Sequence, residues 1–168
     1  MGHTANYGQM TPIHTNYSFQ MYQNSQIDDI NISGDFPIDN ESDGRYWVAA
    51  VHFLRSATKM FYGETSSAAG APPPILKLNG YGDFVFKDIP VVVKSFNLEL
   101  PNGVDYIKVP LSGTPDSSIS VTTGNVAYVP TLSTLSVVLG VAHSRDSVRQ
   151  FSLDKFVKGD YITQGKYI

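Results

Sequence analysis

The feature that most restricts the fold of this chain is a single amphipathic helical segment in a sequence otherwise patterned for strands. Asp39 or Asn40 is placed to cap the start of this helix, acidic residues follow in the first turn, and Gly63 is placed to end it. Apolar side chains recur at intervals of three and four and predict one buried helix face: Trp47, Ala50, Val51, Leu54, Thr58 and Phe61. A lone helix of this kind is expected to cover the flank of a sheet.

Most of the remaining chain alternates between apolar and polar residues, which is typical of half-buried strands. A bulge is expected at Asp28-Asp29, and residues 104–109 are predicted to pair back onto the strand before the Pro101-Asn102-Gly103 turn. Ser152 is placed to cap one short helical turn after the last strand. The predicted strands are residues 17–23, 26–36, 75–78, 84–86, 90–100, 104–109 and 126–143. The pattern therefore predicts a mainly β fold, closed into a sandwich or barrel, with one long flanking helix.

The length of 168 residues favours a single domain. Residues 1–16 are polar and rich in turn formers, so they are expected to form an N-terminal arm and not a core element. Residues 17–168 are then the domain itself. Residues 64–74 and 111–124 are expected to be long surface loops.

The composition favours a protein that assembles with partners. Charged residues make up only 16% of the chain, while Tyr and Phe number 10 and 9. A surface that is poor in charge and rich in aromatic side chains is typical of oligomers, although aromatic residues also fill sheet cores. The net charge of −3 argues against avid phosphate binding, and no cysteine is present for disulfides or thiolate chemistry. No apolar run has transmembrane length, so no membrane partner is expected.

No motif of an enzyme emerges from the sequence. The four histidines, His3, His14, His52 and His143, have no paired spacing typical of a metal site. His52 and His143 could meet in space as ligands, but packed or interface histidines are the more common outcome. Adjacent carboxylates at Asp28-Asp29 point to opposite faces of a strand, so they are expected to be an edge pair. The NGYGDF segment lacks the spacing of a phosphate loop and is interpreted as a hairpin turn at Asn79-Gly80. We therefore predict no catalytic, cofactor-binding or metal-binding residues.

Two groups of residues are candidates for contact between subunits. Arg45, His52, Arg55 and Lys59 form a basic stripe on the helix, which is either a solvated face or a contact for an acidic neighbour or nucleic acid. Aromatic residues of the C-terminal segment, Tyr161 and Tyr167, are the second group.

Five segments of the chain, in order, resemble the tail-tube-type domain of contractile phage baseplate proteins. They are DINISGDF, the helix YWVAAVHFLRSATKMFYG, PPPILKLNGYGDFVF, PVVVKSFNLELPNGVDYI, and YVPTLSTLSVVL with HSRDSVRQFSLDKFVKG. The resemblance implies a tail-tube-like β-sandwich or barrel of two antiparallel sheets with a flanking helix. It also implies six copies in a ring, whose inner sheets form one wall around a lumen.

In such a protein the ring sits on the baseplate hub and starts polymerisation of the tail tube, and DNA passes through the lumen without sequence readout. The resemblance thus implies a structural virion protein, assembled in the host cytoplasm, that is a homo-hexamer and no enzyme. Two alternatives remain open at this point: a repeating tail tube subunit, or a carbohydrate-binding β-sandwich suggested by the tyrosines and the Asn-containing loops.

Overall fold

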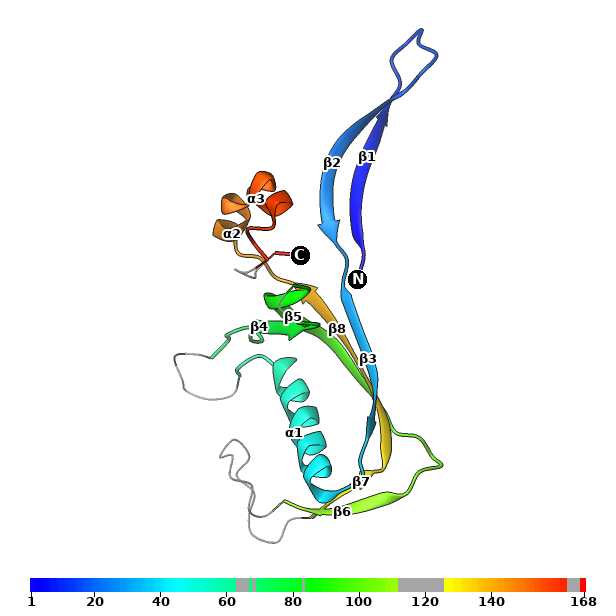
Figure 1. The fold of residues 1–168 in the computed structure, drawn as a ribbon, viewed down its shortest axis with the longest axis vertical. Coiled ribbons are helices and arrows are strands. Elements are labelled where there is room, and N and C mark those ends of the chain that lie inside the picture. The colour runs from blue at the N-terminus through cyan, green and yellow to red at the C-terminus, as the bar shows by residue number, and fades with distance from the viewer. Residues whose placement is uncertain (63–66, 68, 83, 112–125, 163–166) are drawn as a thin grey trace.

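The computed structural model describes residues 1–62, 67, 69–82, 84–111, 126–162 and 167–168. The molecule is elongated, with a central sheet, a projecting hairpin at one end and a small two-stranded ribbon at the other (Figure 1). Its described elements, in chain order, are β1 (His3–Met10), β2 (Phe19–Ile27), β3 (Ile30–Pro37), α1 (Glu41–Ala57), β4 (Leu76–Gly80), β5 (Phe86–Glu99), β6 (Tyr106–Pro110), β7 (Val126–Pro130), β8 (Leu132–Val141), α2 (Arg145–Gln150) and α3 (Leu153–Lys158).

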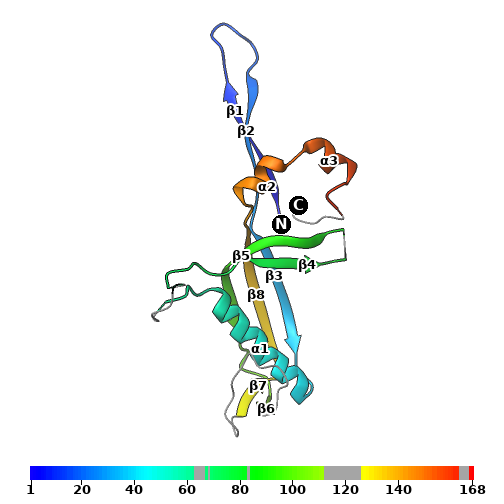
Figure 2. The same ribbon diagram turned by 90° about the vertical axis from the view of Figure 1, so that its left-hand side faces the viewer.

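The central sheet is antiparallel, with the strand order β3-β8-β5-β4, and it is visibly curled (Figure 2). Strand β8 lies in its middle, with Leu139 opposite both Ile30 of β3 and Val93 of β5. Side chains from these strands and from the end of α1 form the main core, which consists of Ile30, Ala57, Ile89, Val91, Val93 and Leu139. The predicted strands at residues 26–36, 75–78 and 90–100 therefore meet in one sheet.

A bulge in β5 ties three strands of this sheet together. The pairing of β5 with β8 shifts register between Val93 and Ser95, which sets Lys94 out of the regular alternation. The Lys94 Nζ lies 2.6 Å from Oδ1 of Asp29, just before β3. Its side chain crosses β8 over Gly140, where an added Cβ would come within 2.7 Å of the Lys94 Cε. The strand predicted at residues 26–36 has no simple bulge at Asp28-Asp29 but is divided there, since β2 ends at Ile27 and β3 begins at Ile30 in a different sheet.

Helix α1 begins as predicted and ends earlier than predicted. The Asn40 side chain caps it by accepting a hydrogen bond from the Asp43 backbone N–H. The helix ends at Ala57, with Thr58 as C-cap, and Gly63 lies outside the described residues. Hydroxyl groups of Ser56 and Thr58 donate to carbonyl oxygens of the preceding turn, which competes with continuation of the helix.

A second core joins α1 to the ribbon formed by β6 and β7. Ile38, Val109 and Val129 are fully buried there, and Trp47 of α1 packs against them. The Trp47 Nε1 donates a 2.8 Å hydrogen bond to the hydroxyl of Ser133, the one described polar residue whose side chain is completely buried. This bond fixes the helix to the start of β8.

The ribbon corrects two predictions about strands. Residues 104–109 are predicted to pair with the preceding strand, but β6 pairs with β7 instead. The long strand predicted at residues 126–143 is divided at Thr131, whose N–H donates to the carbonyl of Asp105 and whose carbonyl accepts from Ile38. This detour lets β7 join the ribbon while β8 joins the central sheet.

The N-terminal region also differs from its prediction. Residues 1–16, expected to be an arm, contribute β1, which pairs with β2 over its whole length. The resulting hairpin projects beyond the sheet (Figure 1). Of the strand predicted at residues 17–23, residues 19–23 belong to β2, but the apolar side chains of Tyr17, Phe19 and Met21 are exposed and not half-buried.

The fold is mainly β, as predicted, and α1 is the long flanking helix. The short helical turn predicted after Ser152 is present as α3, with Ser152 at its N-cap position but without a side-chain capping hydrogen bond. Helix α2 is not predicted. The described residues show a curled sheet with two separate two-stranded pairs, and no sandwich of two sheets appears among them. The β4–β5 hairpin is present, but its turn follows Gly80, with positive φ at Tyr81 and Gly82.

Candidate functional site

Arg45, the first member of the predicted basic stripe, is held within its own subunit. Its Nε donates a 3.0 Å hydrogen bond to the carbonyl oxygen of Pro110, and its Nη2 lies 3.9 Å from a carboxylate oxygen of Glu41. The bond to Pro110 links α1 to the end of β6. Arg45 therefore has a structural role in the subunit, and a role for it in contact with a neighbour remains a prediction.

The other three members of the stripe gather at the C-terminal end of α1. His52, Arg55 and Lys59 are exposed and line an open groove of about 510 Å³. The opposite wall is apolar and comprises Met60, Phe61, Pro72 and Pro74. Backbone hydrogen bonds from the Phe61 N–H to the Ala71 carbonyl and from the Gly70 N–H to the Phe61 carbonyl hold the two segments of the apolar wall together. We call this site the basic groove.

Sequence reasoning finds the cations of the basic groove but misses its apolar wall. The apolar spacing predicts Phe61 on the buried face of a longer helix, whereas its side chain is 44% exposed. The Pro72-Pro73-Pro74 run is interpreted from sequence only as a spacer. Because this run folds back beside the end of α1, the groove combines positive charge with apolar surface.

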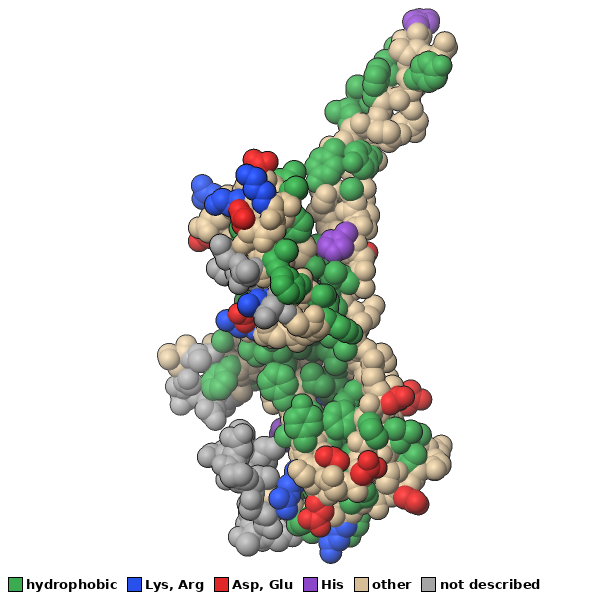
Figure 3. Space-filling view, viewed as in Figure 1, with side chains coloured by type: hydrophobic (Ala, Val, Ile, Leu, Met, Phe, Trp, Pro, Cys, Tyr) green, Lys and Arg blue, Asp and Glu red, His purple; other side chains and the backbone are tan. Residues whose placement is uncertain are grey.

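The β1–β2 hairpin is an exposed apolar feature that the sequence reasoning misses. Strands β1 and β2 pair only with each other in the described structure, and the Tyr7 and Tyr22 rings meet edge to face at 5.8 Å. Figure 3 shows apolar side chains along the hairpin up to its tip. Seven large apolar residues of the hairpin are exposed: Tyr7, Met10, Ile13, Tyr17, Phe19, Met21 and Tyr22. The apolar alternation around Tyr17 marks this surface in the sequence, although the pattern alone predicts that the apolar side chains are buried in a core.

The predicted C-terminal tyrosines lie together and stabilise their own subunit. The Tyr161 and Tyr167 rings are 4.6 Å apart, and Phe151 packs against both. The Tyr167 hydroxyl donates to the Ser147 carbonyl at 2.8 Å, and the Tyr161 hydroxyl donates to the Gln150 carbonyl at 3.3 Å. These bonds hold α2 and the end of the chain together. Whether the tyrosines also contact a neighbour remains a prediction.

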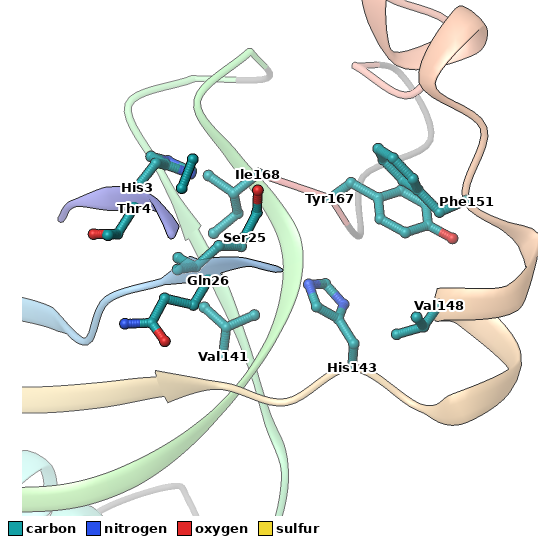
Figure 4. A pocket seen from close by; sticks show the side chains of 12 residues that line it. His3, Thr4, Ser25, Gln26, Val141, His143, Val148, Phe151, Tyr167 and Ile168 are labelled. Atoms are coloured by element: carbon teal, nitrogen blue, oxygen red, sulfur yellow. The ribbon is translucent and has the colours of Figure 1, made fainter. Parts of the chain in front are cut away.

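A cavity of about 540 Å³ lies where the base of the hairpin meets the end of β8 and the C-terminal segment (Figure 4). The His143 ring projects into it, stacked on Tyr167 at 5.7 Å. Burial lowers the pKa of the His143 imidazole from its ordinary value of 6.5, because the charged form loses hydration. His143 and His52 line different cavities and are not brought together as ligands.

The described part of the chain contains no group of three or more acidic or histidine side chains that could hold a metal ion. Within the same residues, no helix has the length and apolar character that a membrane span requires. Comparison with protein-family models, curated proteins and solved structures finds no match to this chain.

Proposed function

We propose that this chain is a structural protein of a phage tail, which forms a hexameric ring at the junction of baseplate and tail tube and starts tube assembly. Its neighbours would be the baseplate hub and the tail tube proteins, and DNA would pass through the ring. Two kinds of support lead to this proposal. One is the resemblance of the five sequence segments, and the other is a fold whose apolar surface and sheet edges need partners.

The observation that carries the proposal is the exposed β1–β2 hairpin. A two-stranded hairpin is at best marginally stable in water without a third strand or a packed face. Here the side chains of Ile13 and Tyr17 are 86% and 82% exposed at the connection between the strands. A projecting, apolar hairpin of this kind is expected to become buried against another subunit. Its length, about 27 Å for the eight residues of β1, is enough to reach across a neighbouring domain.

The edges of the central sheet give the second line of support. Strand β3 is one edge of the sheet and β4 is the other, and each presents unpaired backbone groups that can template a neighbour. In the proposed ring, the β3 edge of one copy meets the β4 edge of the next. The closed, tail-tube-like β layer implied by the resemblance would then be completed between copies, not within one chain.

The electrostatics are compatible with a channel for DNA. The formal net charge is −3, and an overall negative charge on the protein disfavours strong binding of phosphates. We accordingly place the protein in the virion after assembly in the host cytoplasm.

The copy number in purified tailed particles tests the proposal. Quantitative mass spectrometry would measure this chain relative to the main tube subunit. About six copies per particle are expected for one junction ring. Copies in the tens or hundreds would instead identify a repeating tail tube subunit, and absence of the chain from particles would overturn the phage assignment.

A further inference from the structure

The basic groove holds positive charge that no described residue of the subunit neutralises. The side chains of His52, Arg55 and Lys59 have no ion pair or side-chain hydrogen bond with any described residue. Arg55 and Lys59 are charged at neutral pH, and both lie beside the exposed apolar side chains of Met60 and Phe61. A ligand that fits this groove therefore carries negative charge next to an apolar or aromatic group.

Such a surface exists at the opposite end of the same helix. Asp39, Glu41 and Asp43 lie within five residues at the start of α1, and we call residues 39–43 the acidic turn. Asp105 is close by, because the backbone bonds of Thr131 connect residue 105 to Ile38. Figure 3 shows acidic side chains gathered at this end of the molecule.

The acidic turn is largely free of partners within the described part of its own chain. There, Glu41 alone faces a cation, Arg45 at 3.9 Å, and its side chain is still 61% exposed. Among described residues, the carboxylates of Asp39 and Asp43 have no ion pair. Tyr46, one turn further along α1, is 67% exposed and stacks on Phe36. Negative charge and an aromatic ring therefore stand side by side, as the basic groove requires.

These two complementary surfaces cannot neutralise each other within one subunit. They lie at opposite ends of the 17 residues of α1 (Figures 1 and 2), which span about 25 Å. At physiological ionic strength the Debye length is about 8 Å, so charges at this separation are screened from one another. Each surface remains available to another molecule.

We infer that the basic groove of one copy binds the acidic turn of a second copy, with Tyr46 packed against the apolar wall at Met60 and Phe61. The contact joins two different surfaces of the same chain, so it is head-to-tail, and such contacts close into a ring when the rotation permits. This inference rests on the proposed self-assembly and deepens it, because it names the surfaces that neighbouring copies use.

A charge-swap experiment on the full chain tests the inference. Arg55→Glu cancels the positive charge of the basic groove and places a carboxylate opposite the acidic turn of the next copy. Asp39→Lys places a cation opposite Arg55 and Lys59 of the next copy, so each variant should associate more weakly with its own copies. We expect either variant alone to self-associate roughly 10–100-fold more weakly than the wild type in sedimentation velocity at low salt. An equimolar mixture should recover assembly, because the introduced carboxylate then faces the introduced cation at every second contact, while the contacts between them pair the unchanged Arg55 and Asp39. The double variant should recover assembly as well, because it pairs the introduced carboxylate and cation at every contact.

Lys158→Glu and Asp154→Lys are matched controls, since they make the same charge changes on α3, away from both surfaces. Circular dichroism checks that each variant stays folded. Wild-type association in both single variants, or failure of the mixture and the double variant to recover it, overturns the inference and leaves the ring itself untouched. Absence of any self-association by the wild type counts against both the inference and the proposed ring. The copy number in particles then tests the ring separately.

Discussion

Replacement of Gly44 by Ala tests how closely α1 is packed against the ribbon of β6 and β7. In an ordinary helix, Gly→Ala stabilises by about 1 kcal/mol, because Ala loses less backbone entropy. At position 44, however, an added Cβ would come closer than 3.0 Å to Cγ2 of Val109, a separation that real Cβ atoms essentially never show. Val109 is completely buried, so it has little room to move. Overpacking of this kind costs about 1–3 kcal/mol, so after the helix gain of about 1 kcal/mol Gly44→Ala should destabilise by up to about 2 kcal/mol.

The sign of this effect should reverse when Val109 is shortened. Val109→Ala alone should cost about 2–3 kcal/mol, from lost burial and the cavity left behind. In that background the methyl group added by Gly44→Ala enters the cavity, so the substitution should then stabilise by about 1 kcal/mol. Urea unfolding of the four proteins in this double-mutant cycle measures both effects.

A matched control is available at Gly34 of β3, where an added Cβ meets nothing within 4 Å. Gly34→Ala should leave stability unchanged or raise it by up to about 1 kcal/mol. A Gly44→Ala variant that is more stable than the wild type would refute the close packing of α1 on Val109. Such a result would also count against the position of α1 relative to the ribbon of β6 and β7.

Three further predictions concern the hairpin, the cavity and the C-terminal segment. Ile13→Ser combined with Tyr17→Ser should weaken self-association about tenfold or more. The urea unfolding midpoint should not move, since both side chains are over 80% exposed. An unchanged sedimentation profile would exclude the hairpin from the interface. Because burial lowers the pKa of His143 below its unfolded value, its contribution to stability is present above pH 6.5 and is lost as the pH falls through the folded-state pKa. His143→Gln should therefore reduce the loss of urea stability between pH 7.5 and pH 5, and an unaltered pH dependence would contradict this reading. Tyr167→Phe removes the bond to the Ser147 carbonyl and should cost about 1 kcal/mol, seen as faster hydrogen exchange in α2; exchange at the wild-type rate would show that the bond does not hold α2.

Local features of the fold are predictable from sequence because their causes lie within a few residues. The cap of α1 needs only Asn40 and the N–H of Asp43 three residues later. The predicted end of the same helix is wrong, because the hydroxyls of Ser56 and Thr58 compete for its last carbonyls, an effect that apolar spacing does not register. Helix α2 has six residues, too few to display a helical period.

Strand pairing and burial are less predictable, because they depend on distant parts of the chain. Alternation around Tyr17 indicates that one face is apolar, but not whether the subunit itself covers that face. Likewise, the short turn after β5 suggests a hairpin with β6, while the actual partner is β7 across the segment 111–125. The role of the basic stripe is equally hard to predict from sequence, since Arg45 donates its hydrogen bond to the carbonyl of Pro110, 65 residues away in sequence.

The position of β8 has a consequence for how the protein is made. It is the last of the described strands along the chain, yet it lies between β3 and β5, and Ile30 of β3 pairs with Leu139. On the ribosome, β3 must therefore wait for a partner that is synthesised 109 residues later (139 − 30). Contacts of such long sequence separation form late in folding, so we expect the sheet to close only once β8 has emerged. An unfinished chain would lack the completed sheet and its paired edges, and the order of the strands would thereby keep incomplete copies from joining finished ones.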